Sequence, residues 1–310
     1  SGPDCVISEE FSLSLHLGTR PTAMATTRIA AIMRAGAFSP NHIGNDATIM
    51  NTVAEQLRKR GCEVNIYSEE QFGAGNVSEP VIINMCREQR STELLQHFED
   101  KGILVINSGY GIENCIRERQ ARILLGSNIP YPESIIVDTD EVVKQRLARL
   151  GMQQCWIKRG DFHNRHAEDV SYVRSAHEAQ DVLQEYFLRG FKRAVISRHL
   201  PGQLVKFYGV DGTSFFHWFK PFEPEGHKPS REEHRATDEQ LKALCRRAAR
   251  ELGLIVYGGE CILADDGTLS IIDFNDWPSF SSCRAEAATN IAKAVMTAIK
   301  ERKEGNNLKA

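Results

Sequence analysis

The sequence predicts an α/β protein that begins with a small, mostly parallel sheet. Three observations favour this class. Short strand-like apolar runs alternate with helical patterns over most of the 310 residues. Two hairpin signals, Asp211-Gly212 and Asp266-Gly267, lie in the second half of the chain. The length suits about two domains of roughly 150 residues each, or one elaborated fold.

The first part of the chain predicts alternating strands and helices of the parallel type. Its first helix carries Ile49, Val53 and Leu57 on one face. Pro130 and Pro132 then stop the last of these helices and mark the start of a second region. We expect strands at 29–33, 64–67, 81–85 and 103–107, and helices at 45–60, 92–100 and 112–125.

The second region predicts several hairpins and four helices. The segment 221–235 is polar and proline-rich, and we expect it to be a long exposed loop of the kind that often serves as a lid. We expect strands at 134–137, 155–158, 170–173, 195–199, 204–210, 215–219, 255–264 and 269–274. We expect helices at 141–150, 176–188, 239–252 and 285–303, the last ending at Gly305.

The charge and cysteine content narrow the expected partners. With 38 basic and 41 acidic side chains, the net charge of −3 provides no cationic excess for a dedicated nucleic-acid binder. No apolar run approaches the roughly 20 residues that span a bilayer. None of the eight cysteines forms a CxxC pair, so we expect reduced thiols in a cytoplasmic protein. Small-molecule substrates are the expected partners, and the oligomeric state stays open, with a homodimer as one option.

The segment 1–24 has neither a basic start nor a sustained apolar stretch, unlike a secretory signal. Met24 lies directly before the first strand-like run. We therefore expect 1–24 to be a tag or a disordered extension, and Met24 to be the natural start.

A predicted hairpin near the end of the chain carries the most informative side chains. Its two strands can place Glu260 and Asp273 side by side, and Asn275, two residues further on, points to the same face. Two carboxylates and an amide oxygen are ligands that suit Mg²⁺, which takes its other ligands from water and nucleotide phosphates. The alternative is that these acids pair with lysine or arginine.

This ordered pattern resembles the ATP-grasp superfamily, which includes ribosomal-protein glutamate ligases, glutathione synthetase and inositol trisphosphate kinases. Trp156-Ile157-Lys158 resembles the strand whose lysine reaches the nucleotide phosphates, and 195–202 resembles the strand and turn that hold adenine. The resemblance covers about 28–303. It implies an N-terminal α/β domain at 25–110 and two α+β subdomains that clasp ATP, a lid subdomain at 111–200 and a metal- and nucleotide-binding subdomain at 201–304.

The resemblance also implies roles for individual residues. Glu260, Asp273 and Asn275 would hold one or two Mg²⁺ ions that bridge the ATP phosphates. Lys158 would contact the α- and β-phosphates as a point charge. Lys206 and Lys220 would lie near the phosphates, with surface cations as the alternative. A hinge segment would bind adenine through its backbone; it consists of Ser197, Arg198, His199 and Leu200.

Three departures from the family pattern bear on the function. A lysine common on the helix after the first domain is missing, and we expect either Arg117 or Arg119 to replace it; Arg119 is one of the expected nucleotide-binding residues. The loop 159–166 has one glycine where relatives are glycine-rich. Asp273 is shorter than the glutamate common among the ligases, and an Asp-x-Asn form also occurs in the inositol-phosphate kinase branch.

The acceptor site is expected between the first domain and the metal centre, in loops at the carboxyl ends of strands. Arg87 and Arg90 could grip a carboxylate or phosphate, or be ordinary surface arginines. The loops 36–44 and 276–282 are further candidates. Within the second loop, Trp277 is expected either to line the pocket or to fill the core. The serines 281 and 282 are expected either to donate hydrogen bonds to the acceptor or to cap the final helix.

The resulting prediction is an ATP-dependent ligase. It would phosphorylate a carboxylate to an acyl-phosphate, which an amine or a thiol then attacks; Lys158, Arg87 and Lys220 are its expected catalytic residues. The second hypothesis is a kinase that phosphorylates a hydroxyl, supported by Asp273-x-Asn275. The third is a nucleotide-binding regulatory protein with poor turnover.

Overall fold

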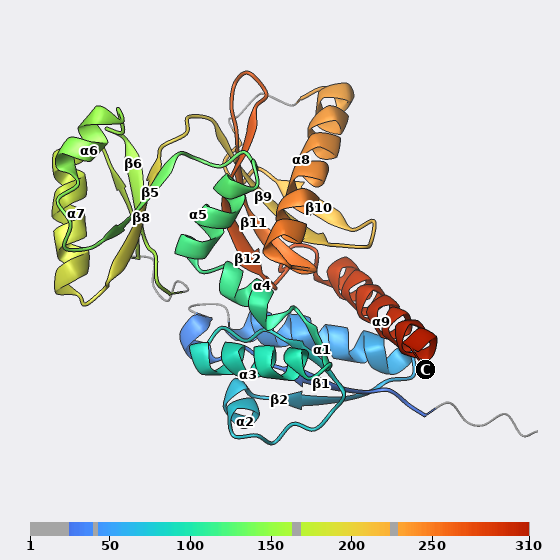
Figure 1. Cartoon of the computed structure of the whole chain (residues 1–310). Helices are drawn as coiled ribbons and strands as arrows, with labels where there is room; N and C mark the ends of the chain where they lie inside the picture. The colour runs from blue at the N-terminus through green and yellow to red at the C-terminus, as the bar shows by residue number, and fades with distance from the viewer. Residues whose placement is uncertain (1–24, 40–42, 163–168, 224–228, 310) are drawn as a thin grey trace, which may run out of the picture.

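The computed structural model describes residues 25–39, 43–162, 169–223 and 229–309. Within these ranges the strands form three four-stranded sheets, one parallel and two antiparallel. The parallel sheet lies at the bottom of Figure 1, one antiparallel sheet lies at the left and the other in the upper centre. The predicted α/β class, with a parallel N-terminal domain followed by two α+β subdomains, is confirmed.

The parallel sheet has the strand order β2-β1-β3-β4. Ile29 and Ala31 of β1 face α1, whereas Ala30 and Ile32 face the opposite layer of α2, α3 and α4, so the strand is buried on both faces. The elements are β1 (Arg28–Ile32), η1 (Gly36–Phe38), α1 (Ile43–Lys59), β2 (Glu63–Tyr67), α2 (Glu69–Gly73), β3 (Val81–Asn84), α3 (Gln89–Asp100) and β4 (Leu104–Ile106).

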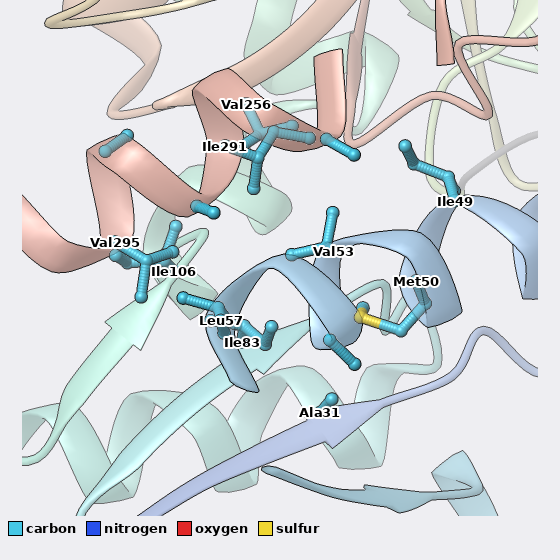
Figure 2. Close-up of a cluster of buried hydrophobic side chains, with 14 of the residues drawn as sticks. Ala31, Ile49, Met50, Val53, Leu57, Ile83, Ile106, Val256, Ile291 and Val295 are labelled. Carbon is cyan, nitrogen blue, oxygen red and sulfur yellow. The ribbon is translucent and has the colours of Figure 1, made fainter. Parts of the chain in front are cut away.

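The last helix, α9 (Arg284–Lys309), returns to this first domain and packs alongside α1 (Figure 1). Ile291 and Val295 of α9 meet Val53 and Leu57 of α1 in one buried cluster, which Figure 2 shows. The predicted end at Gly305 is wrong, because the helix continues through that residue to Lys309.

The first antiparallel sheet has the order β5-β8-β6-β7, and α6 and α7 cover one of its faces. Cys155 and Ile157 of β6 point into this apolar layer, so Trp156 and Lys158 point to the other face. The elements are β5 (Ser134–Asp138), α6 (Lys144–Arg149), β6 (Cys155–Arg159), β7 (Val170–Val173), α7 (Ala176–Leu188) and β8 (Arg193–Arg198).

The second antiparallel sheet has the order β10-β9-β11-β12, with α5 and α8 over its apolar face. Helix α8 begins at Arg231, eight residues before the predicted start at 239, so the end of the expected loop at 221–235 is helical. The reason is a capping box in which Ser230 and Glu233 bond reciprocally. Residues 224–228 of that loop lie outside the described ranges. The elements are β9 (Gln203–Val210), β10 (Phe216–Phe219), α8 (Arg231–Leu252), β11 (Val256–Leu263) and β12 (Leu269–Asp276).

The single helix predicted at 112–125 is wrong. The structure has two helices, α4 (Gly109–Asn114) and α5 (Arg117–Gly126), because Ile116 adopts an extended conformation and starts a new helix. Nearby, the side-chain amide of Asn107 ties the end of β4 to the start of β11: it accepts from the N–H groups of Ile255 and Val256 and donates to the Val256 carbonyl.

Two further features concern the described residues as a whole. Among the helices the structure describes, none has both the length and the apolar character that crossing a bilayer requires. The seven cysteines in the described ranges are free thiols, six of them buried.

Candidate functional site

One face of the sheet β10-β9-β11-β12 carries the charged residues that the sequence analysis identified. Alternation along the strands buries Phe207 and Phe274 under α5 and α8 and leaves Lys206 on the opposite face. Glu260 of β11 pairs directly with Lys206 on β9 and with Asp273 on β12. Directly paired residues point to the same face, so the predicted proximity of the two carboxylates is confirmed.

A β-bulge in β12 is responsible for this arrangement. Two successive residues of β11 pair with Asp273 and Ile271, which leaves Ile272 as an extra residue. Without the bulge, Asp273 would share the core-facing side of the strand with Ile271. The extra residue turns Asp273 and Asn275 to the polar face, as bulges beside functional sites often do.

The two carboxylates have cationic neighbours, but only at long distances. Lys206 Nζ lies 3.9 Å from Glu260 Oε1, and Arg117 Nη2 lies 3.8 Å from Asp273 Oδ2. Both distances exceed those of hydrogen bonds. Burial, followed by the nearby charge of Asp273, raises the pKa of Glu260. The two acids are therefore close together and only partly neutralised.

The donor set suits a magnesium ion better than a metal held by protein alone. Nowhere in the described ranges do three His, Cys, Asp or Glu side chains converge as a metal-binding group. The site offers two carboxylates, from Glu260 and Asp273, and the amide of Asn275 on the same face of β12. Mg²⁺ usually takes one or two protein carboxylates and completes its shell with water and phosphates, so these residues fit it.

Lys158 lies opposite this face, on the other antiparallel sheet. Its side chain is buried, and Nζ donates a hydrogen bond to the carbonyl oxygen of Ile272 at 3.1 Å. Burial, followed by the charge of Arg117, lowers the pKa of Lys158 to about 8, while Asp273 and Glu260 oppose the shift. The residue therefore belongs to the same electrostatic cluster as the two carboxylates.

The structure distinguishes Arg117 from Arg119. Arg117 is the first residue of α5 and points to Asp273; its Nη1 is buried with no hydrogen-bond partner in the part of the chain that the structure describes. Arg119 is half-exposed on the other side of the helix, where it bonds the Asn114 side chain and lies 4.0 Å from Glu113. Arg119 is therefore misplaced in the expected nucleotide-binding set, because it points away from the cluster.

The expected adenine hinge spans the end of β8 and the two residues after it, and most of its polar groups are already bonded. The Ser197 hydroxyl bonds Ser134, and the N–H groups of Arg198 and His199 donate to carbonyls of residues 133 and 154. The Arg198 side chain bonds Glu133, and His199 Nδ1 accepts from the Trp156 indole at 3.1 Å. Within the described ranges, the N–H of Leu200 is the backbone donor of the hinge that these contacts leave available.

A large cavity of about 880 Å³ is lined by sequence neighbours of Lys158 and Arg117, although neither of these two residues nor the two carboxylates lines it. It is bounded by α3, by the loop after β6 and by Ile116, which precedes Arg117. Arg159, directly after Lys158, lines it and stacks between the rings of Phe162 and Phe191. Residues 163–166 of the expected phosphate loop lie outside the described ranges.

Arg87 also lines this cavity, and an interaction that the sequence analysis missed holds it in place. Its Nε lies 3.3 Å from Oδ1 of the buried Asp276, the residue after Asn275. Arg34 donates to the carbonyls of Asp276 and Trp277 and pairs with Asp46 at 3.3 Å. Burial, followed by the charge of Arg87, lowers the pKa of Arg34 to about 10. These buried charges connect the first domain to the end of β12.

The remaining candidates lie outside the cluster. Lys220 is half-buried directly after β10, whose last residue pairs with Lys206. Arg90 is exposed and bonds the carbonyl of Gly73. Trp277 is fully buried and fills the core. The serines 281 and 282 are exposed before α9, and of the loop 36–44 residues 40–42 lie outside the described ranges.

Comparison with known proteins identifies the fold. A scan against protein-family models and a search of curated protein sequences each give no match. Among solved structures, the chain is similar to a D-alanine–D-alanine ligase from Bacillus anthracis in complex with ATP (TM-score 0.67, 14% identity, 90% of this chain and 99% of that chain). It is also similar to a RimK domain ATP-grasp protein from Sphaerobacter thermophilus (0.66, 17%, 86% and 99%) and to the ATP-grasp ligase PsnB with minimal precursor, Mg and ADP (0.58, 18%, 88% and 98%). The chain has the ATP-grasp fold.

Proposed function

We propose that the protein is an ATP- and Mg²⁺-dependent ligase that joins a carboxylate to an amine or a thiol through an acyl-phosphate. The observation that carries the proposal is the meeting of Lys158 and Arg117 with Glu260 and Asp273 between the two antiparallel sheets. Similar structures include a ligase with bound ATP and one with Mg and ADP, which supports this choice of nucleotide and metal.

Two cations of the chain are placed to bind the phosphates. Lys158 is buried and its pKa is depressed, so negative phosphate charge beside it would be strongly favourable. The unpartnered Nη1 of Arg117 would donate to a phosphate oxygen. Adenine would bond the free N–H of Leu200. Arg117 thus takes the role expected of the missing helix lysine.

The carboxylates of Glu260 and Asp273 and the amide of Asn275 would hold Mg²⁺. When bound, the ion neutralises charge on the ATP phosphates. The charge of Lys206, 3.9 Å from Glu260, partly opposes the rise in the pKa of Glu260 that burial and Asp273 cause.

The reaction requires two successive displacements. A carboxylate oxygen of the first substrate attacks the γ-phosphorus, and ADP leaves. The amine or thiol of the second substrate then attacks the acyl carbon, inorganic phosphate leaves with its bridging oxygen, and the nucleophile loses a proton. The cavity lined by Arg87 would hold the acceptor, with the guanidinium kept in place by Asp276. Positioning and charge neutralisation are the chain's contribution.

A kinase is the second candidate, because Asp273 and Asn275 form the shorter Asp-x-Asn pattern on β12. In that case the γ-phosphate would remain on a hydroxyl of the product, and no inorganic phosphate would be released. The two reactions therefore differ in the fate of the γ-phosphate, which a ligase releases as inorganic phosphate and a kinase leaves on the product.

Isotope transfer separates the two. The protein would be incubated with ATP labelled with ³²P in the γ-phosphate, Mg²⁺, hydroxylamine and pools of polyols and of carboxylic acids, the acids labelled with ¹⁸O in the carboxylate. A ligase would produce a hydroxamate and inorganic phosphate containing one ¹⁸O, since the bridging oxygen comes from the acid. Label from the γ-phosphate on a hydroxyl product would support the kinase instead. Nucleotide binding without ATP consumption in any pool would overturn both and favour a regulatory protein.

A further inference from the structure

The outer edge of β12 is held by a side chain instead of a strand. Gln120 of α5 is buried and bonds both backbone groups of Phe274: the Phe274 N–H donates to Oε1 at 3.1 Å, and Nε2 donates to the Phe274 carbonyl at 2.8 Å. These two bonds reproduce the pair that a neighbouring strand would make.

The two bonds between Gln120 and Phe274, called the clamp below, lie beside the proposed metal ligands. β12 is the edge strand of its sheet, so its outward N–H and C=O groups have no strand partner. Phe274 lies between Asp273 and Asn275, two of the three proposed metal ligands. The clamp therefore fixes the backbone at the one residue that sets the directions of both neighbouring side chains.

Helix α5 contacts the same segment of β12 a second time. Arg117, three residues before Gln120 and on the same face of the helix, lies 3.8 Å from the Asp273 carboxylate. The first turn of α5 also bonds the other antiparallel sheet, because the Glu118 N–H donates to the carbonyl of Gly160. One rigid helix thus contacts both the metal-ligand strand and the loop that follows Lys158.

We propose that Gln120 is a positioning residue that holds Asp273 and Asn275 in the geometry a metal ion requires. The inference rests on the proposed function, because it takes these two residues as ligands. Other groups bond β12 before Asp273, since the Ile271 N–H donates to the Pro130 carbonyl and the Ile272 carbonyl accepts from Lys158. The physical reason for the proposal is that the edge at Phe274 would relax without Gln120, and the two oxygen donors would no longer point to one position. The role lies in the backbone of Phe274, which touches no substrate.

The test measures metal affinity directly. Mn²⁺, which is visible by electron paramagnetic resonance, would be titrated into the full chain with saturating ADP. Gln120→Met has nearly the same length and removes both bonds to Phe274, together with a longer bond of 3.4 Å to the Cys115 carbonyl. We expect it to weaken Mn²⁺ binding about tenfold, as loss of a residue that orients a ligand does elsewhere. Hydrogen exchange at the Phe274 amide should become faster in the same variant. ADP affinity without metal should be unchanged.

A matched control separates positioning from general stability. Asn107→Leu removes a comparable amide clamp from β11, at Ile255 and Val256, so it should destabilise the fold yet leave Mn²⁺ affinity within about twofold. If Gln120→Met does not fold, the uncharged and smaller Gln120→Leu removes the same bonds to Phe274, and the same loss of Mn²⁺ affinity is expected. Unchanged Mn²⁺ affinity in the folded variant overturns the inference. Absence of Mn²⁺–ADP binding in the unaltered protein overturns the proposed function instead.

Discussion

The ammonium group of Lys158 donates a hydrogen bond to the carbonyl oxygen of Ile272, 3.1 Å away on the facing sheet. Ile272 is the extra residue of the β12 bulge. The same irregularity therefore turns Asp273 to the polar face and provides an acceptor for the buried lysine. The contact keeps Lys158 in position before nucleotide binds, and a phosphate oxygen could then take the place of this carbonyl.

The depressed pKa of Lys158 predicts a pH-dependent affinity for ATP. Below its pKa of about 8 the lysine is charged in the free protein, and above that pH it is neutral. Bound phosphates favour the charged form, so binding above pH 8 requires uptake of a proton. We expect the Kd for ATP, measured without metal, to be constant below pH 8 and to rise by up to about tenfold per pH unit above it.

Lys158→Met is the control for this titration. Its ATP affinity should be weak and flat over the same pH range. The free proteins give a second readout, because the folded pKa of Lys158 lies below its ordinary value of 10.5. Between pH 8 and 10.5 the unfolded chain binds more protons, so the unaltered protein should gain stability relative to Lys158→Met as the pH rises. A constant difference in free energy of unfolding would show that Lys158 titrates normally.

Asp273→Asn should abolish turnover and leave the fold intact. The substitution removes the charge of one proposed metal ligand but keeps its size and its position on β12. We expect kcat to fall at least about 100-fold, with little change in the free energy of unfolding, since Asp273 is partly exposed and its cationic neighbour lies at 3.8 Å. Asp266→Asn, on the exposed turn of the same hairpin, is the matched control and should retain activity. Full activity of Asp273→Asn would exclude Asp273 as a metal ligand.

Arg34→Met should destabilise the protein strongly. The substitution removes the buried cation that lies between Asp46 and Asp276 and leaves both carboxylates less compensated. Breaking a buried ion pair in this way costs about 3–5 kcal/mol, which urea denaturation would measure. Arg28→Met breaks a long pair, at 3.9 Å, between the half-exposed Arg28 and the buried Glu79. Because Asn65 and Tyr67 also donate hydrogen bonds to the Glu79 carboxylate, the change should cost no more than about 1 kcal/mol. Equal losses in the two variants would contradict a supporting role for the buried charges.

The hairpin that carries the carboxylates could be predicted, but the reason that they converge could not. The Asp266-Gly267 turn and the alternating strands indicate that Glu260 and Asp273 are near one another. Strict pairing from that turn, however, would place Glu260 opposite Ile272, and Asp273 would point into the core. The bulge corrects this, and no residue type marks its position, because the extra residue is an ordinary isoleucine.

The sequence also could not predict one helix break or the contacts between distant segments. The break between α4 and α5 has no proline or glycine at Cys115 or Ile116, so periodicity continues across it. Arg34 and Asp276 are far apart in the chain and meet only in the folded protein. Gln120 did have a signal: it is a polar residue on the buried face of α5, one turn before the buried Leu124.

Arg117 and Arg119 provide a matched pair for the last prediction. Arg117 points to the cluster with an unpartnered buried Nη1, whereas Arg119 bonds Asn114 away from it. Arg117→Ala should weaken ATP binding by at least about tenfold through loss of a charge-assisted hydrogen bond, and Arg119→Ala should change it by no more than about twofold.

The charge of Arg117 also lowers the pKa of Lys158, so its removal should move the onset of the pH dependence above pH 8. Calorimetric titration of ATP across pH 7–10 measures both effects. If Arg119→Ala weakens binding and Arg117→Ala does not, the replacement for the missing lysine has been assigned to the wrong arginine. If the affinity falls in Arg117→Ala but the onset does not move, Arg117 and Lys158 are not coupled through one site.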